Sequence, residues 1–455
     1  MRNTAPLFAG AFLIFATAAH AQTPPSLAGD WDGGLKVPAG IEVPLILHLT
    51  DTGATLDSPD QNAKGVAATL SRNGDAVVLE IPSSKARFTA TLSADGKTLT
   101  GTFAQGGATM PAHFSRRAAG AAAPQRDRPQ TPKPPFPYQT EDVRFTGGGG
   151  AVLAGTLSRP NGPGPFPAVV MIAGSGPQNR DEAVEGHKIF LVIADRLTRA
   201  GIAVLRYDKR GVGESKGSYA TATTTDFTTD AEAAVAWLQG QPGIAKGKLG
   251  LIGHSEGSEI APVVAEHDPH IAFVVLLSTP AVSGLETIVS QQRAIAEASG
   301  VPDVTANAQS SLERRVLELV RQSPDEASAK AAVAKVLTQV GLSPDQAEVQ
   351  AAQVSSPWFR EFLNDDPAPA LARLRQPTLV VAGSKDLQVL PDMNLPVIRK
   401  ALAGNRGAKI VELDGLNHLL QPAKTGAPSE YGTTTISVAP EALDLITDWV
   451  VRRTR

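Results

Sequence analysis

The pentapeptide Gly-His-Ser-Glu-Gly at residues 253–257 lies between an apolar run, Leu249–Ile252, and a segment with helical periodicity, Ile260–Glu266. Glycines two positions before and after the serine let neighbouring backbone approach closely, so the chain can turn sharply from strand to helix. Such a turn exposes the serine hydroxyl at the carboxyl edge of a sheet. The pentapeptide therefore predicts an α/β architecture in which Ser255 is the nucleophile.

Residues 138–455 alternate between strand-like and helix-like segments. Short apolar runs, typical of strands buried on both faces, occur at Val169–Ile172, Ala203–Leu205, Leu249–Ile252, Phe273–Leu277 and Thr378–Val381. Amphipathic segments lie between them at Ile189–Arg199, Thr229–Leu238 and Ile260–Glu266. This alternation predicts an α/β fold with a mostly parallel sheet and helices on both faces.

Residues 281–370 interrupt this alternation with a helical pattern and no strand. Ser323 and Ser343 are each followed by proline, aspartate, and Glu or Gln. This is the pattern of a serine N-cap with proline at the first helical position. We therefore predict a helical cap, inserted between two strands, whose helices begin after these two serines and which covers the substrate pocket.

Residues 26–117 have the pattern of a small all-β domain. Apolar and polar residues alternate over Ala86–Ser93, with the period of a half-buried strand. Asn-Gly at 73–74 and Asp-Gly at 95–96 lie between such runs, where a hairpin turn needs a positive φ. An antiparallel barrel or sandwich is expected. The Pro- and Ala-rich residues 118–137 are predicted to be a stiff linker that belongs to neither core.

A serine hydroxyl needs a base, and the base needs an orienting carboxylate. In this architecture the acid and then the histidine follow the serine along the chain. Asp386 comes directly after a strand-like run that ends at Gly383, and His418 follows the short strand-like run Lys409–Leu413. We predict Ser255, Asp386 and His418 as the catalytic triad, with the serine and the histidine at exposed loop positions.

Two other residues compete for these roles. Asp414 is the alternative acid, but it is only four residues from His418 and does not end a sheet strand, so Asp386 is preferred. His254 adjoins the nucleophile, but the turn should hold it where it cannot reach the serine hydroxyl. No other histidine follows His270, so His418 has no competitor as base in the last third of the chain.

The oxyanion of an acyl-transfer reaction needs two hydrogen-bond donors. The backbone N–H of Glu256, directly after the nucleophile, is one candidate. The other is the backbone N–H of Ser175, in the Gly-Ser-Gly-Pro segment at 174–177 that follows an apolar strand. A glycine-rich turn can also bind phosphate, but no Lys-Ser or Lys-Thr pair follows it, which argues against a nucleotide site.

Composition removes several classes of function. The chain of 455 residues has no cysteine, which excludes disulfides, thiolate metal sites and a cysteine nucleophile. A net charge of −3 offers no basis for binding nucleic acid or an anionic membrane surface. The eight histidines are scattered, and we expect neither a metal nor an organic cofactor.

Residues 1–21 have the pattern of a secretory signal peptide. Arg2 precedes an apolar stretch, Ala5–Ala19, and Ala-His-Ala at 19–21 has the small-x-small pattern of a cleavage site. A membrane anchor is the alternative, but the stretch is shorter than the ~20 residues that span a bilayer. We expect cleavage after Ala21 and export to a periplasm or the outside of the cell, with no stable membrane anchor.

Residues 138–455 resemble the α/β-hydrolase superfamily, and they are most similar to bacterial carboxylesterases and serine-aminopeptidase-like hydrolases. The motifs that carry the resemblance are the pentapeptide at 253–257 together with segments 174–181, 207–215, 383–386 and 416–418. The resemblance implies that Asp208 and Arg210 support loops. Ala173 stands where many members have histidine, and Ser356–Arg360 also resembles these hydrolases. The N-terminal domain resembles a module found ahead of some secreted bacterial serine hydrolases, but it lacks the aromatic platform of a carbohydrate-binding domain.

The resemblance implies a serine hydrolase that cleaves small-molecule carboxylic esters of small to medium acyl groups through an acyl-enzyme. A peptidase or amidase of the serine-aminopeptidase type, acting on peptides or cell-wall fragments, is the alternative. A non-catalytic binding protein is a third possibility, disfavoured by a triad in the expected order. The oligomeric state is not predicted.

Overall fold

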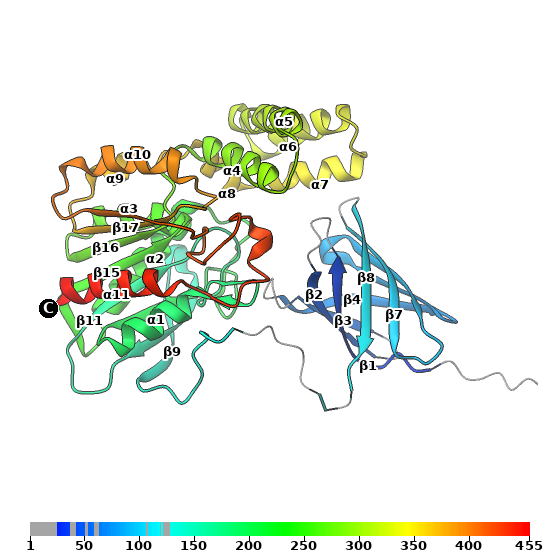
Figure 1. Cartoon of the computed structure of the whole chain (residues 1–455), viewed down its shortest axis with the longest axis horizontal. Coiled ribbons are helices and arrows are strands. Elements are labelled where there is room, and N and C mark those ends of the chain that lie inside the picture. The colour runs from blue at the N-terminus through cyan, green and yellow to red at the C-terminus, as the bar shows by residue number, and fades with distance from the viewer. Residues whose placement is uncertain are drawn as a thin grey trace, which may run out of the picture.

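A computed structural model describes residues 25–36, 42–50, 53–58, 63–105, 108–118, 120–121 and 128–455. The chain forms a β-barrel followed by a larger α/β unit (Figure 1). The predicted signal peptide, residues 1–21, lies outside the described residues.

The N-terminal unit is a closed barrel in which each strand pairs with the next and the last pairs with the first, antiparallel throughout. Its strands are β1 Gly29–Lys36, β2 Glu42–Leu49, β3 Ala54–Ser58, β4 Ala63–Asn73, β5 Ala76–Ile81, β6 Ala86–Leu92, β7 Thr98–Gln105 and β8 Ala108–Arg116. Alternate residues of β6 are buried, as the period-two pattern predicts. Trp31, Phe88 and Phe114 fill the interior, so the barrel encloses a packed core. The prediction of a small all-β domain is confirmed.

The α/β unit is built on an eight-stranded sheet with the order β18-β17-β16-β15-β11-β14-β10-β9. These strands are β9 Gln139–Thr146, β10 Val152–Arg159, β11 Phe166–Ile172, β14 Ala203–Tyr207, β15 Ile244–His254, β16 Ile271–Leu277, β17 Thr378–Gly383 and β18 Lys409–Leu413. β10 is antiparallel to both of its neighbours, and the other pairings are parallel. The carboxyl ends of the parallel strands therefore share one edge, where the predicted site residues lie.

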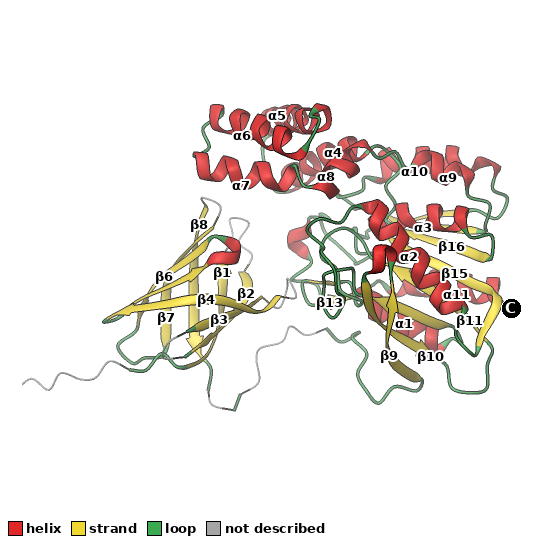
Figure 2. Cartoon of the chain, turned by 180° about the vertical axis from the view of Figure 1, so that it is seen from behind, coloured by secondary structure: helices red, strands yellow, loops and turns green. Residues whose placement is uncertain are grey.

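Helices cover both faces of this sheet (Figures 1 and 2). One face packs against α2 Thr224–Gln239, α3 Glu256–His267, α9 Ala368–Arg373 and α10 Pro391–Ala401. The other packs against α1 Ile189–Arg199 and α11 Pro440–Thr454. Both faces of the central strands are therefore buried, which explains their nearly continuous apolar sequences. A short hairpin, β12 Ala183–Val184 and β13 His187–Lys188, precedes α1.

A group of helices inserted between β16 and β17 forms the cap (Figure 2). It consists of α4 Gly284–Ala298, α5 Asp303–Gln322, α6 Glu326–Gln339, α7 Pro344–Val354 and α8 Pro357–Asn364. These helices share an apolar core of their own, to which Val316, Val320 and Val333 contribute. The cap is therefore a separately packed group of helices.

One of the two predicted helix starts in the cap is wrong. Ser343 caps α7, and its hydroxyl accepts the backbone N–H of Gln346 as expected. The N-cap of α6, however, is Asp325, whose carboxylate accepts the backbone N–H of Ser328 at 2.7 Å. Ser323 instead ends α5 and donates its hydroxyl to the carbonyl of Leu319. Two capping residues lie two positions apart here, and the hydroxyl of Ser323 is already bonded to the last turn of α5.

At the end of the predicted linker, Arg128 and Gln130 dock on the α/β unit through hydrogen bonds, although none of residues 128–137 enters an apolar core. The Arg128 guanidinium donates to the carbonyl of Thr434 at 2.8 Å, and the Gln130 side chain bonds with the backbone of residues 437–438. Proline-rich composition predicts stiffness, but it contains no information about the surface on which a segment docks.

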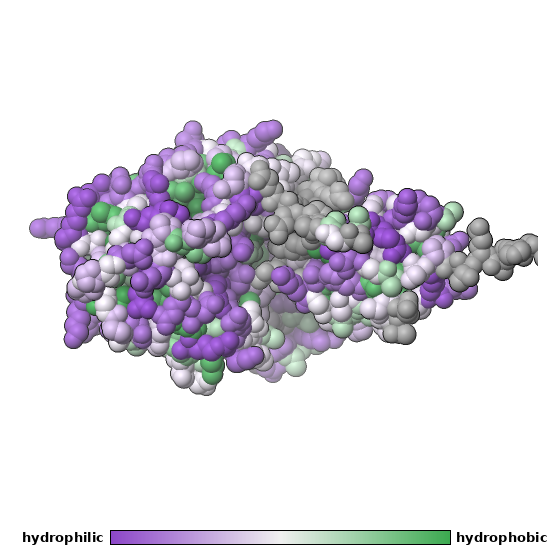
Figure 3. Space-filling model, turned by 90° about the horizontal axis from the view of Figure 1, so that it is seen from below, coloured by the Kyte–Doolittle hydropathy of each residue, from purple (hydrophilic) through white to green (hydrophobic). Residues whose placement is uncertain are grey.

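The surface seen in Figure 3 is mostly hydrophilic, with hydrophobic side chains scattered among polar ones. None of the helices in the described part of the chain combines the length and apolar character needed to cross a bilayer.

Candidate active site

The turn between β15 and α3 holds Ser255 in a strained backbone conformation. Its φ is 51° and its ψ is −119°, a region that costs a non-glycine residue on the order of 1–3 kcal/mol. A Cβ on Gly253 would lie 2.1 Å from the carbonyl oxygen of Gly257, and a Cβ on Gly257 would lie 1.9 Å from that of Ile172. Only glycine fits at either position, so the two glycines are what permits this turn.

The loop after β11 lies directly against the nucleophile. A Cβ built on Gly174 would be 3.2 Å from the Cβ of Ser255. The two segments predicted to hold the oxyanion, at Ser175 and Glu256, are the immediate continuations of these contacting residues. Glu256 also begins α3, so the positive end of the helix dipole faces this place. The fold thus places the segments that contain these two predicted donors against each other.

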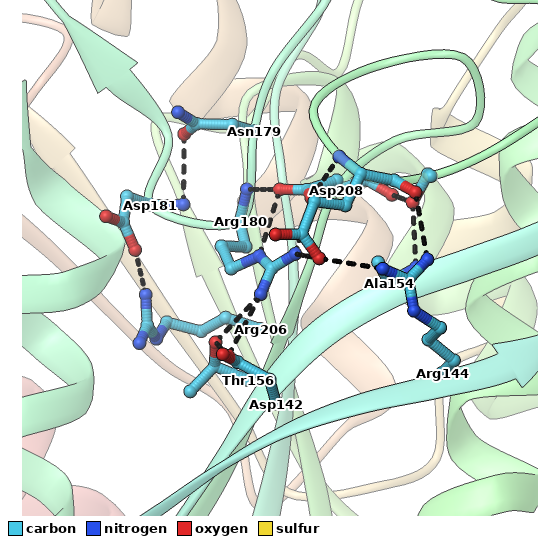
Figure 4. Close-up of polar contacts among 11 residues, drawn as sticks. Asp142, Arg144, Ala154, Thr156, Asn179, Arg180, Asp181, Arg206 and Asp208 are labelled. Atoms are coloured by element: carbon cyan, nitrogen blue, oxygen red, sulfur yellow. Dashed lines mark hydrogen bonds and ion pairs between the residues drawn. The ribbon is translucent and has the colours of Figure 1, made fainter.

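A network of ion pairs anchors the loop that contains Ser175 (Figure 4). The Arg180 guanidinium bonds to both oxygens of Asp208, at 3.1 and 2.7 Å, and also to the hydroxyl of Thr156. Asp181, the next residue, pairs with Arg206 on β14. The loop is therefore tied to the sheet at two successive positions, which limits the freedom of its backbone N–H groups.

Arg210 has a comparable supporting position. Its guanidinium bonds to Asp230 at 2.7 Å and to Asp226 at 2.9 Å, both on α2. Asp208 and Arg210 are thus both engaged within the protein, in agreement with the structural role that the resemblance implies for them.

Asp386 and His418 form a buried pair. The His418 Nδ1 lies 2.8 Å from Oδ2 of Asp386. The other carboxylate oxygen, Oδ1, accepts the backbone N–H groups of Gln388 and Val389 at 2.9 and 2.8 Å. Asp386 is 1% exposed and His418 is 4% exposed. The expectation of an exposed loop histidine is therefore wrong, because the ring is enclosed by its acid partner and by His254.

Asp414 has a different partner. Its Oδ1 accepts the Ser384 hydroxyl at 3.0 Å, and the backbone N–H of Gly415 donates to the same hydroxyl at 2.8 Å. These bonds brace the turn after β18 against the end of β17. The geometry thus pairs His418 with Asp386 and uses Asp414 in the turn.

No pattern in the sequence indicates a role for the pair formed by His254 and Glu182. The His254 Nδ1 lies 2.9 Å from Oε1 of Glu182, and its Nε2 lies 3.0 Å from the backbone carbonyl oxygen of His418. The same Glu182 oxygen accepts the backbone N–H of Gly174 at 2.7 Å. Burial alone would lower the pKa of His254, but the Glu182 carboxylate, the His418 carbonyl and Asp386 together outweigh it, and the net shift is upward. No local pattern links these residues, which are 72 positions apart.

The side chain of Glu256 connects the nucleophile turn to the cap. Its Oε1 accepts the Trp358 indole N–H at 2.6 Å and the Thr224 hydroxyl at 2.7 Å, and its Oε2 pairs with Lys209 at 2.7 Å. Trp358 lies on α8, in the segment Ser356–Arg360. This segment thus attaches the cap to the residue directly after the nucleophile.

Residues 149–400, more than half of the chain, match the X-Pro dipeptidyl-peptidase (S15) family. The chain belongs to this family. Together with the strand order and the turn at Ser255, membership of the S15 family confirms the predictions of an α/β-hydrolase fold and of a serine hydrolase.

The S15 chain also resembles individual proteins. Esterase EstD of Thermotoga maritima is 28% identical over 319 residues, which cover 70% of this chain and 69% of EstD. The structure of the Pyrococcus furiosus esterase Pf2001 matches with 16% identity and a TM-score of 0.45, over 70% of this chain and 92% of that one. The α/β hydrolase GrgF from Penicillium sp. sh18 matches with 17% identity and a TM-score of 0.46, over 70% of this chain and 99% of that one.

The described part of this S15-family chain contains no cluster of three or more His, Cys, Asp or Glu side chains that could hold a metal ion. The groups that the described residues place in the candidate site are the serine hydroxyl, the histidine with its buried acid, and backbone N–H groups. Acyl transfer through a covalent intermediate requires a nucleophile, a base with its acid, and oxyanion donors of these kinds.

Proposed function

We propose that this protein hydrolyses carboxylic esters of small to medium acyl groups, with Ser255 as nucleophile, His418 as base and Asp386 as the acid that orients it. The observation that carries the proposal is the strained Ser255 turn, which lies against the loop after β11, together with the buried Asp386–His418 pair. The likeness to Esterase EstD supports the choice of an ester as substrate.

In the first half of the reaction the Ser255 hydroxyl attacks the ester carbonyl. His418 Nδ1 is engaged by Asp386, so Nε2 is the atom that takes the serine proton. The carbonyl oxygen becomes an oxyanion and accepts the backbone N–H groups of Ser175 and Glu256. Collapse of this intermediate breaks the bond to the alcohol, which leaves with the proton from His418 and gives an acyl-enzyme.

In the second half, water replaces the alcohol. His418 takes a proton from the water as its oxygen attacks the acyl carbon, and a second oxyanion forms against the same donors. Its collapse breaks the bond to Ser255, which regains a proton from His418 while the carboxylic acid leaves. Removal of one oxyanion donor costs about 10²–10³ in kcat in a related chemistry, so the anchoring of the loop by Arg180 matters for rate.

We assign the acyl chain to a cavity that is lined in part by Leu387, the residue after Asp386, and that also has charged side chains, including Arg293 and Arg314, in its wall. It has a volume of about 1000 Å³ and lies between α4, α5 and the segment that follows Asp386. Val289, Leu387, Leu390 and Met393 contribute apolar surface to it. This size is at the upper end of small-molecule pockets, roughly 300–1000 Å³, and it supports a preference that extends to medium acyl groups.

The acyl pocket is tested by filling it. Val289→Trp should lower kcat/KM for octanoyl esters at least tenfold while acetyl esters change little, because only the longer chain needs the occupied volume. Val304→Trp is the matched control, since Val304 is 83% exposed on the neighbouring helix α5. Equal losses on both esters would show that the acyl chain lies elsewhere.

A peptidase or amidase is the second candidate, and it is favoured by the family, whose description is X-Pro dipeptidyl-peptidase. The two functions share the same nucleophile and differ in the leaving group. Purified mature protein should be assayed on matched pairs of ester and amide, including an X-Pro dipeptidyl p-nitroanilide. A higher kcat/KM on the anilide than on simple esters would replace the esterase proposal.

A non-catalytic role is separated from both by labelling with a fluorophosphonate, which reacts only with an activated serine. We expect one label, lost in Ser255→Ala. An unlabelled but folded protein would exclude either hydrolase function.

We also propose that the protein is exported, because residues 1–21 have the pattern of a cleavable signal. The exported form should begin at Gln22, which intact-mass measurement of the protein from the producing cells would establish. A mass that still includes residues 1–21 would contradict this proposal. The expected partner is a small-molecule ester, without nucleic acid or a stable membrane anchor.

A further inference from the structure

The buried pair of Glu182 and His254 lies between the two halves of the active site. The Glu182 Oε1 accepts the backbone N–H of Gly174, in the loop that precedes Ser175. His254 Nε2 faces the backbone carbonyl of His418, which also accepts the hydroxyl of Ser278 at 2.7 Å. His254 itself is joined to Ser255 by a peptide bond. A single side-chain pair thus connects the loop after β11, the nucleophile turn and the histidine loop.

Both ring nitrogens of His254 face acceptors, a carboxylate oxygen and a carbonyl oxygen. A neutral imidazole has only one N–H, so it could donate to only one of them. An imidazolium donates to both. The geometry therefore favours a His254 that carries a proton on each nitrogen, opposite an ionised Glu182.

We propose that Glu182 and His254 form a permanent carboxylate–imidazolium pair, and that Glu182 is a positioning residue that sets the distance between the oxyanion loop and the catalytic histidine. The pair acts only through the backbone, since Glu182 bonds to the N–H of Gly174 and His254 bonds to the carbonyl of His418. The kinetic part of this inference rests on the function proposed for the site.

The surroundings of His254 are consistent with this charge state. The titratable groups that face it are Glu182 on one side, and His418 and Asp386 on the other, with the His418 ring centroid 4.9 Å away. The carboxylates of Glu182 and Asp386 favour the charged form of His254, and its pKa is raised despite burial.

Glu182 has two features that a merely space-filling residue would not need. Its φ is +46°, a conformation that is unfavourable for a residue with a Cβ. Its second carboxylate oxygen, Oε2, is buried and has no hydrogen-bond partner within the described part of the chain. Both features raise the free energy of the folded protein, and the hydrogen bonds of Oε1 to Gly174 and His254 offset that cost.

The first test reads the charge directly, without substrate. The mature protein, labelled with ¹⁵N-histidine, keeps seven of the eight histidines of the sequence, because His20 lies in the predicted signal peptide, and His254→Gln identifies the signal of His254. We expect His254 to be protonated on both nitrogens at neutral pH and above, where an ordinary histidine has lost one proton. In Glu182→Gln the doubly protonated form should disappear at neutral pH. A singly protonated His254 in the unmodified protein would overturn the proposal.

The second test reads the positioning effect. Glu182→Gln should slow fluorophosphonate labelling of Ser255 and lower kcat on an acetyl ester by tenfold or more, while KM changes by less than about twofold. The reason is that misplacement of reacting groups by about 1 Å can cost roughly 10² in rate. Glu232→Gln is the matched control, since it removes the carboxylate of a surface Glu–His pair with His267 (2.6 Å) and should change neither rate.

Near-UV circular dichroism and thermal unfolding show whether each variant is folded. If Glu182→Gln does not fold, His254→Gln takes its place, because it removes the charge but keeps a donor for the His418 carbonyl. A folded Glu182→Gln protein with kcat within twofold of the unmodified protein would refute the positioning role. Absence of ester hydrolysis in the unmodified protein, with His254 doubly protonated, would instead count against the proposed function, and the labelling rate would still test the pair.

Discussion

Replacement of Asp386 by asparagine should disable the reaction while leaving the fold in place. Oδ1 of Asp386 accepts two backbone N–H groups, from Gln388 and Val389, and an asparagine must keep its oxygen there. Its NH₂ group then takes the place of Oδ2, which lies 2.8 Å from Nδ1 of His418. Nδ1 can meet an N–H donor only as a lone pair, so the proton moves to Nε2 and that nitrogen can no longer take the proton of Ser255.

The expected loss is about 10⁴ in kcat, the cost of the wrong histidine tautomer in a protease triad, and it corresponds to about 5.5 kcal/mol of activation free energy. The assay is kcat on a soluble acetyl ester at neutral pH, with thermal unfolding as a check of the fold. KM should change little, because Asp386 is buried and contacts no substrate.

Asp414→Asn is the matched control. The asparagine oxygen can still accept the Ser384 hydroxyl, so the turn after β18 should persist and kcat should stay within about threefold, since a neutral surface substitution of this kind shifts free energy by ±0.5 kcal/mol. A large loss in Asp414→Asn and a small one in Asp386→Asn would refute the assignment of the acid and place it in the histidine loop.

Three further predictions concern the nucleophile, the cap and the segment before β9. Ser255→Ala should abolish turnover, with a loss of up to about 10⁶ in kcat as in a protease triad, and leave thermal unfolding unchanged; retained turnover in this variant would refute the mechanism. His418→Ala should abolish turnover and also cost about 2–3 kcal/mol in the free energy of unfolding, because it leaves the buried Asp386 carboxylate without its partner. Trp358→Phe removes the hydrogen bond between the cap and Glu256 and should raise KM about tenfold, which corresponds to roughly 1.4 kcal/mol of binding free energy. Trp237→Phe on α2 is the control and should leave the kinetics unchanged. Equal effects of the two substitutions would show that the Trp358–Glu256 bond does not anchor the cap. A protein that begins at residue 122 should keep kcat on a small ester. A protein that begins at Thr140 lacks residues 128–137 and the hydrogen bonds that Arg128 and Gln130 make, so its free energy of unfolding should be several kcal/mol lower. Equal stability of the two proteins would show that this docking contributes little.

Local sequence determined the elements that border the site. The boundaries of α1 and β18 match the predicted segments Ile189–Arg199 and Lys409–Leu413, because periodicity reports directly which face of an element is buried. The turn at Ser255 was predictable for the same reason, since Gly253 and Gly257 are required by close approaches within a short stretch of chain and its nearest strand.

Other features depend on contacts between distant segments, and only the tertiary structure decided them. The bond between Trp358 and Glu256 and the docking of Arg128 on Thr434 join residues 102 and 306 positions apart, and the burial of His418 depends on the side chains of Asp386 and His254 that pack around it. A pattern of residue types specifies which groups could bond, but the order and twist of the strands specify which of them meet. Glu182 is the clearest case, because its carboxylate bonds to a histidine that is 72 positions away in the sequence and that the sheet places beside it.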